Sequence, residues 1–423
     1  MLQINFVRDN PGKVIERLKV KNFDATDIVN NIVEVDAKRR EAQKNLDNNL
    51  AESNTLAKRI GELYKTGKKE EAEEIKERTS NLKQLNKELQ QTLDKYKEEQ
   101  NNLLMQLPNL PHESVPMGNS EEDNQVIYEN AEKISDSKNL SPHWDLATKF
   151  DLIDFELGNK ITGAGFPLYK GKGAMLQRSL IRFFIDKAIE AGYTEYQVPL
   201  LVNEASAFGT GQLPDKDGQM YYIPLDNLYL IPTSEVPVTN IFRDVILNEE
   251  AFPIKCTAYS ACFRREAGSH GKDVRGLNRL HQFDKVEIVQ VVKPEYSYNA
   301  LDEMVNYVGE LVNLLGLPYR ISRLCGGDLG FAAAMTYDFE VYSVAQEKWL
   351  EVSSISNFEG YQANRMKLRY RNNKSKTEPA HTLNGSALAL PRLIAALLEN
   401  NQSDKGIKIP DVLVPYTGYE FIT

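Results

Sequence analysis

Apolar residues in the first hundred positions recur at intervals of three or four, which is the spacing of one face of an α-helix. Two such series are separated by a short basic turn, Lys65–Lys69. The first series is Ile28, Ile32, Val35, Ala42, Leu46, Leu56, Ile60 and Leu63, and the second is Ala72, Ile75, Thr79, Leu82, Leu89, Tyr96, Leu103 and Leu107. The pattern predicts an antiparallel helical hairpin that extends about 55 Å at ~1.5 Å per residue.

This hairpin has no globular core beside it in the sequence, so we expect it to project as an arm. Arg39, Asn49 and Ser53 interrupt the first apolar series, which limits the stability of the pair. An oligomerisation coiled coil would give the same pattern. The alternative is a stiff arm that touches an elongated partner. RNA phosphates would suit the basic residues at its outer end, which are Lys58, Arg59, Lys65, Lys68 and Lys69.

Prolines end the second helix. Gln106–Pro111 contains two of them, and each disfavours helix at the residue before it. The stretch that follows, to about Lys138, is polar and acidic and is typical of a linker. The predicted organisation is an N-terminal domain over 1–110, a linker over 111–140 and a globular domain over 141–423.

Between Tyr259 and Val292 the pattern predicts two strands joined by a long basic loop with three glycines. The loop, Ala267–Arg279, suits contact with a phosphate backbone because it carries lysine and arginine side chains, Lys272 among them. Side chains of a strand alternate between faces, so charged and aromatic groups gather on one face of this pair. They are Arg264, Glu266, Phe283, Lys285 and Glu287. Burial of such a set is costly unless a ligand meets it.

Composition limits the kinds of partner, metal site and cellular location that we expect, but it identifies no reaction. The 423 residues carry a net charge of −9, which argues only weakly against a nucleic-acid partner because local patches decide such binding. Three scattered cysteines without a CxxC pair predict neither disulfides nor a cysteine-based zinc site. There is no apolar run of about 20 residues and no secretory signal, so we expect a cytoplasmic protein without a membrane partner.

The strand pair carries a resemblance to a known family. Phe263–Glu266, Arg279 and Phe283 resemble motif 2 of the class II aminoacyl-tRNA synthetases, here spanning about 259–292. His281–Glu287, HQFDKVE, is similar to the seryl-tRNA synthetases of the bacterial type. Motif 1 would span about 174–199, a helix followed by a strand, and motif 3 about 382–400. The resemblance implies an α+β fold with a mixed, mainly antiparallel sheet of six to seven strands, flanked by helices and preceded by a two-helix coiled-coil arm.

The resemblance also implies site residues. Those expected to bind serine are Thr233, Ser234, Glu235, Glu287 and Ser386. Those expected to bind ATP are Arg264, Arg265, Glu266, Phe283, Glu351, Val352, Ser353, Ser354 and Arg392. Among them Arg264, Glu266 and Arg392 are the expected catalytic residues, and Glu351 and Ser354 the expected Mg²⁺ ligands. The family pattern has glycine where this chain has Ala387 and Pro391, which leaves the local geometry of motif 3 open.

The function that the resemblance implies is ATP-dependent activation of L-serine, followed by transfer of serine to tRNA(Ser), with tRNA(Sec) as a further acceptor. The arm and the motif 2 loop would hold the tRNA, and a homodimer built on motif 1 would let one tRNA bridge two subunits. Two alternatives remain. One is a ligase that loads an amino acid onto a carrier protein, and the other is an inactive synthetase-like scaffold built on a coiled coil.

Overall fold

The computed structural model describes residues 1–130, 140–215, 217–266 and 275–423. They form two compact units, Met1–Pro108 and Asn109–Thr423. Most of the predicted motif 2 loop, Lys272 included, lies outside the described residues. Among the helices that are described, none has the length and apolar character needed to cross a membrane.

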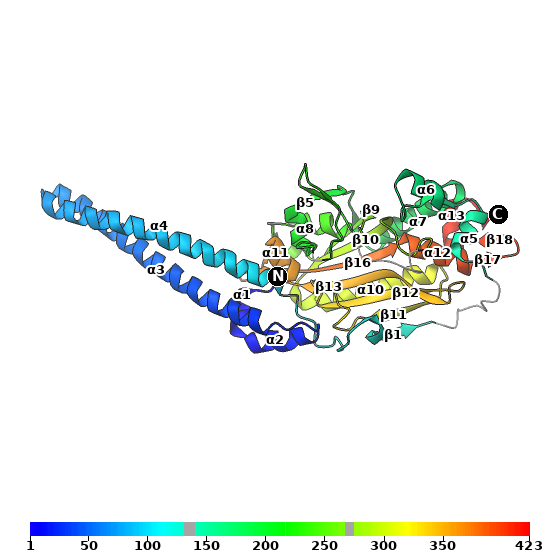
Figure 1. Cartoon of the computed structure of the whole chain (residues 1–423), viewed down its shortest axis with the longest axis horizontal. Helices are drawn as coiled ribbons and strands as arrows, with labels where there is room; N and C mark the ends of the chain where they lie inside the picture. Colours follow the sequence, from blue (N-terminus) through cyan, green and yellow to red (C-terminus); the bar gives the residue numbers. More distant parts are fainter. Residues whose placement is uncertain (131–139, 216, 267–274) are drawn as a thin grey trace. The chain divides into compact units, whose positions relative to one another are not determined.

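The first unit is dominated by two long antiparallel helices, α3 (Thr26–Lys65) and α4 (Lys69–Gln106), which run side by side in Figure 1. Two short helices, α1 (Ile4–Asp9) and α2 (Pro11–Lys19), pack on α3. The apolar seam between the long helices includes Ala42, Leu46 and Leu93. Further out, a polar contact joins Ser53 to Asn86 at 3.5 Å. The predicted helical hairpin is confirmed, and its seam is thin.

A buried carboxylate lies inside this unit. Asp36 is fully buried and accepts hydrogen bonds from Arg39 at 2.9 Å and from Gln100 of α4 at 3.0 Å. Arg40 pairs with its other oxygen at 3.0 Å. Burial alone would raise the pKa of Asp36, but the hydrogen bonds from Arg39 and Gln100 outweigh it, so the pKa is lowered. Arg39, which interrupts the apolar series in the sequence, therefore serves a buried ion cluster.

The second unit is built on a sheet of eight strands in the order β1-β11-β12-β13-β16-β10-β9-β4. Every neighbouring pair is antiparallel except β4–β9, which is parallel. The bounds are β1 Gln125–Glu129, β4 Thr194–Glu195, β9 Ile254–Phe263, β10 Gln282–Val292, β11 Tyr319–Arg323, β12 Met335–Ser343, β13 Lys348–Glu359 and β16 His381–Ala389. The mainly antiparallel sheet is confirmed, although it has eight strands rather than six or seven.

The additional strand comes from the predicted linker. Within 111–140, the segment β1 pairs with β11 at the edge of the sheet, so this stretch is not a linker throughout. All five side chains of β1 are exposed. Because no side chain of β1 is buried, buried apolar and exposed polar positions do not alternate along it, which is why the strand was missed.

Helices flank the sheet in Figure 1. The longest are α7 (Gly171–Glu190), α10 (Ser297–Leu314) and α12 (Leu390–Asn400), and each packs on central strands. The remaining helices are α5 His143–Lys149, α6 Phe155–Ile161, α8 Glu204–Thr210, α9 Glu235–Asn240, α11 Tyr361–Met366 and α13 Val414–Thr417. Short strands outside the main sheet are β2 Ile153–Asp154, β3 Leu168–Tyr169, β5 Leu201–Asn203, β6 Tyr222–Ile223, β7 Leu228–Leu230, β8 Ile246–Asn248, β14 Arg369–Arg371, β15 Thr377–Pro379, β17 Gln402–Ser403, β18 Gly406–Lys408 and β19 Phe421–Ile422.

Candidate active site

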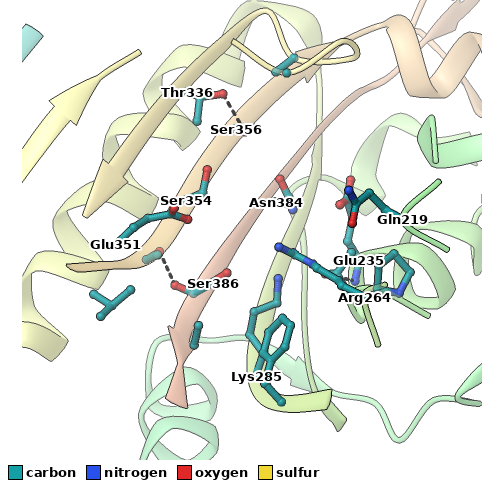
Figure 2. Close-up of a pocket in the computed structure, with 18 of the residues that line it drawn as sticks. Gln219, Glu235, Arg264, Lys285, Thr336, Glu351, Ser354, Ser356, Asn384 and Ser386 are labelled. Carbon is teal, nitrogen blue, oxygen red and sulfur yellow. Dashed lines mark hydrogen bonds between the residues drawn. The ribbon is translucent and has the colours of Figure 1, made fainter. Parts of the chain in front are cut away.

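The central strands line a cavity of about 670 Å³. The predicted site residues that line it are Thr233, Glu235, Arg264, Glu266, Phe283, Glu351, Val352, Ser353, Ser354, Ser386 and Arg392. In Figure 2, Glu351 and Ser354 lie on one side of this cavity, and Arg264, Lys285 and Glu235 lie on the other. Residues more than 150 positions apart in the sequence therefore share one space.

Three predicted residues, Ser234, Arg265 and Glu287, do not line the cavity. Ser234 is fully buried, and its hydroxyl oxygen lies 2.6 Å from that of Ser260. Successive side chains of an extended segment point to opposite sides, so Arg265 points away from the cavity that Arg264 lines. Its guanidinium lies 5.8 Å from the ring centre of Tyr221. Glu287 is fully buried and reaches the cavity only through its partners.

The end of β9 presents Arg264 to the cavity. The backbone N–H of Arg264 donates to the carbonyl of His281 at 2.9 Å, which continues the pairing with β10 by one step. Its guanidinium carbon lies 5.2 Å from the ring centre of Phe283 on β10. Glu266, two residues further on, forms an ion pair with Arg279 at 3.1 Å. A cation, an aromatic face and a carboxylate thus stand together at one edge of the cavity.

Glu287 organises the polar corner beside this edge. One of its oxygens accepts from the Thr233 hydroxyl at 2.9 Å and pairs with Lys285 at 2.6 Å. The other accepts from the side-chain amide of Asn384 at 3.1 Å. A buried carboxylate with three such partners holds them in fixed orientations. Thr233, Lys285 and Asn384 all line the cavity, so Glu287 sets how this corner faces a ligand.

Glu235 is the second carboxylate of this corner and begins α9. It accepts from the side-chain amide of Gln362 at 2.7 Å, and Gln362 in turn accepts from Thr382 at 2.7 Å. Burial, and then the charge of Glu287, raises the pKa of Glu235 to about 7. Because its ionised form is unfavourable in this buried place, the Glu235 carboxyl group is well suited to a cationic ligand, whose charge would favour ionisation.

A β-bulge brings Glu351 and Ser354 to one face of β13. Glu351 pairs with Glu340 of β12 and Ser353 with Phe339, so Val352 is the extra residue. In a regular strand, residues three apart would face opposite ways. The bulge reverses that alternation, and both side chains line the cavity. Ser353, which also lines the cavity, donates to the carbonyl of Ser386 at 2.6 Å.

The side-chain oxygens on this face suit a metal ion that takes most of its ligands from water or from a bound substrate. Asp338 of β12 pairs with Ser354, and among the described residues no donor bonds to its buried Oδ1. Burial, and then the charge of Glu351, raises the pKa of Asp338 well above its ordinary value. Among the described residues, no group of three or more acidic, histidine or cysteine side chains could hold a metal alone. Two or three hard oxygens with open positions suit Mg²⁺ that also binds phosphates.

The segment predicted to be motif 3 ends in a helix that carries Arg392 to the cavity. Pro391 lies in the first turn of α12, where its missing N–H leaves no hydrogen bond unmade. Arg392 donates to the carbonyl of Asn278 at 2.9 Å and to the carbonyl of Glu351 at 3.1 Å. Ala387 is fully buried. With alanine and proline at these two positions, Arg392 still lines the cavity.

Sequence reasoning missed several polar residues in and around the site, among them Asn384 and Gln362. Asn384 lies two positions before Ser386 on β16, so strand alternation alone could have placed it on the same face. Gln362 belongs to α11 and meets Glu235 across 127 positions of sequence. No local pattern signals such a contact.

Two protein families match this chain. The family described as "Seryl-tRNA synthetase N-terminal domain" matches residues 1–111. The family described as "tRNA synthetase class II core domain (G, H, P, S and T)" matches residues 222–401, which contain most of the cavity lining.

Relatives and solved structures agree over the full length. A serine–tRNA ligase of Salinibacter ruber is 50% identical over 421 residues, covering 99% of this chain and 98% of the relative. The crystal structure of a Pyrococcus horikoshii seryl-tRNA synthetase complexed with ATP has 32% identity and a TM-score of 0.86, with 99% of each chain covered. A cytoplasmic enzyme of the same kind from Naegleria fowleri, in complex with AMP, has 26% identity and a TM-score of 0.88, covering 100% of this chain and 99% of that one. The chain therefore belongs to the seryl-tRNA synthetase family.

Proposed function

We propose that this chain is a serine–tRNA ligase that uses ATP to form seryl-adenylate and then charges tRNA(Ser), with tRNA(Sec) as a further acceptor where one exists. The observation that carries the proposal is the single cavity shared by Arg264, Phe283, Glu351, Arg392 and Glu235. In the first step a carboxylate oxygen of serine attacks the α-phosphorus of ATP, and the bond to the bridging oxygen breaks to release pyrophosphate. In the second, the ribose 3′-hydroxyl at the end of the tRNA attacks the acyl carbon and AMP leaves.

Neither step requires a nucleophile from the protein, so the chain acts by positioning and charge stabilisation. Arg264 holds the α-phosphate and the serine carboxylate, as a planar guanidinium can bind two oxygens at once. Phe283 stacks on adenine, and Glu266 accepts from the adenine amino group. Arg392 holds the terminal phosphate.

Serine binds in the corner around Glu287. Glu235 pairs with the serine ammonium, and Thr233 and Ser386 line the same space. Glu287, which already holds Thr233, Lys285 and Asn384, fixes the donors and acceptors that meet the serine hydroxyl. A site built to hydrogen-bond a hydroxyl rejects alanine by up to ~10⁴-fold, since its own polar groups would be left unpaired.

Serine binding is expected to weaken as the pH falls. The pKa of Glu235 in the free protein is about 7, so the carboxyl group is ionised above that pH and protonated below it. Only the ionised form pairs with an ammonium. The KM for serine in ATP–pyrophosphate exchange should therefore rise below pH 7, by up to about tenfold per pH unit. In Glu235→Gln the KM should be higher at pH 8 but constant from pH 8 to pH 6. A flat profile in the unaltered protein would contradict this role.

Mg²⁺ would be held by Glu351 and Ser354 together with the phosphates, where it would neutralise charge on ATP. Glu351→Gln is expected to weaken Mn²⁺ binding in the presence of a non-hydrolysable ATP analogue by at least about tenfold, as titrated by electron paramagnetic resonance. Glu347→Gln, an exposed carboxylate at the turn between β12 and β13, is the matched control and should bind as the unaltered protein does. Equal affinities for the two variants would refute the assignment.

We further propose that the α3–α4 arm and the motif 2 loop bind tRNA, that the protein is a cytoplasmic homodimer, and that one tRNA bridges two subunits. The basic residues of the arm are compatible with phosphate contacts, and RNA helices are read mainly by shape and backbone. The decisive experiment is serine-dependent charging of purified tRNA(Ser). A carrier-protein ligase would leave the tRNA uncharged, and an inactive scaffold would show no exchange with serine.

A further inference from the structure

The segment that leads back from the motif 2 loop lies flat against a buried histidine. The backbone N–H of Leu277, which is fully buried, donates to Nε2 of His143 at 2.8 Å. Gly276 has φ +67°, and a Cβ atom there would lie 2.1 Å from the same nitrogen. The guanidinium of Arg275 packs 4.5 Å from the ring centre of Trp144, the residue after His143. The start of α5 is therefore a docking surface for 275–277.

The other side of the imidazole meets a buried carboxylate. A backbone N–H can only donate, so Nε2 of His143 accepts and the ring proton is on Nδ1. Nδ1 donates to Glu399 Oε1 at 2.7 Å, and both side chains are fully buried. The same oxygen accepts from Gln346 at 2.9 Å, and the other accepts from the hydroxyl of Ser343. With these partners in place, the imidazole has one orientation in which all its hydrogen bonds are made.

Glu399 and Arg392 belong to the same helix, α12, seven residues apart. Two turns of helix place them on a common face. Arg392 donates directly to the carbonyl of Asn278 at 2.9 Å, while Glu399 holds Leu277 through His143. Two peptide groups of one loop segment, separated by a single peptide group, are thus held by two residues of α12: by Arg392 directly and by Glu399 through His143. Together these contacts form a closed ring.

We propose that His143 and Glu399 are positioning residues for ATP binding: they fix the segment 276–278, and this segment aims the guanidinium of Arg392 into the cavity. The inference rests on the proposed contact between Arg392 and the ATP phosphates. Leu277 lines the cavity and bonds to His143, while neither His143 nor Glu399 lines it. Their effect on the reaction is therefore transmitted through the loop backbone.

Two substitutions of His143 separate the halves of this ring. In His143→Asn the amide can occupy the place of Nδ1 and donate to Glu399, but it cannot reach the N–H of Leu277. In His143→Gln the amide oxygen can occupy the place of Nε2 and accept from Leu277, but the bond to Glu399 is lost. We expect the KM for ATP in exchange to rise about tenfold in His143→Asn, and by only about threefold in His143→Gln, which keeps the bond to Leu277 but loses the bond to Glu399 that orients the side chain. The KM for serine should be unchanged in both.

A purely structural role for His143 gives a different result. Both variants disturb a buried network. If they acted only by destabilising the protein, the rise in KM would be larger in the variant with the lower unfolding temperature, and it would appear for serine as well as for ATP. Gly276→Ala gives an independent test from the loop side, because its methyl group would push the segment off His143. It should reproduce the ATP-specific rise. Equal behaviour of His143→Asn and His143→Gln, or a serine effect as large as the ATP effect, would overturn the inference.

A double-mutant cycle separates this inference from the proposed function. If His143 acts through Arg392, adding His143→Asn to Arg392→Ala should change the KM for ATP by less than about twofold. Additive effects would overturn the inference and leave the role of Arg392 intact. If Arg392→Ala alone left ATP binding and exchange unchanged, the proposed contact of Arg392 with ATP would itself be wrong.

Discussion

Arg264→Ala is expected to lower serine-dependent ATP–pyrophosphate exchange by at least about 10³-fold. In the proposed complex this guanidinium meets the α-phosphate, where charge develops during the reaction. It lies beside Phe283 and across the cavity from Glu351. Its removal takes away the cation beside Phe283, and the nearby Lys285 is already paired with Glu287. Exchange measured at saturating serine and ATP gives the loss in kcat.

Two comparisons sharpen this expectation. Arg264→Lys keeps the charge but loses the fork geometry, so it should recover only part of the activity. Arg371→Ala removes an exposed arginine from β14, outside the cavity, and should exchange at the rate of the unaltered protein. Activity of Arg264→Ala within tenfold of the unaltered protein would rule out its role in adenylate formation.

Shortening the arm is expected to separate the two half-reactions. Removal of 52–86, with 51 joined to 87 by a short glycine turn, deletes the outer part of α3 and α4. The inner apolar seam and the bond between Asp36 and Gln100 remain. Exchange should stay within about twofold, because the cavity belongs to the other unit. Charging of tRNA(Ser) should fall by at least about 10²-fold in kcat/KM, since phosphate contacts supply much of the affinity for RNA.

The salt dependence of charging provides the control. In the unaltered protein the KM for tRNA should rise steeply with salt concentration, and the shortened protein should show a shallower dependence because it makes fewer phosphate contacts. Equal losses of exchange and charging would mean that the arm supports folding rather than RNA binding.

Local patterns were sufficient for much of this fold. The three-to-four periodicity identified α3 and α4, and the first apolar position of each series, Ile28 and Ala72, lies within three residues of the start of its helix. Strand alternation placed Arg264 and Glu266 on one side. The same rule puts Arg265 on the other side, so it argues against the ATP-binding role that only the resemblance implied for Arg265. The edge strand β1 could not be predicted because all its side chains are exposed, so no alternation of apolar and polar residues marks it.

Contacts between distant segments could not be predicted. The bulge at Val352, which lets Glu351 and Ser354 share a face, depends on the register with β12. Gln362 reaches Glu235 only because α11 packs near α8 and the central strands. Asp36 and His143 look like ordinary polar residues in the sequence, and their burial depends on Gln100 and Glu399, which lie 64 and 256 positions away.

The thin seam of the arm has a consequence for how such proteins diverge. Ser53 faces Asn86, and Tyr64 near the end of α3 faces Glu73 near the start of α4. An insertion in one helix alone would rotate its apolar stripe away from the other by about 100° per residue. Changes in arm length during evolution must therefore occur in matched pairs, close to multiples of seven residues on each helix. The reach of this protein toward an RNA partner should vary among its descendants in steps of roughly 10 Å rather than continuously.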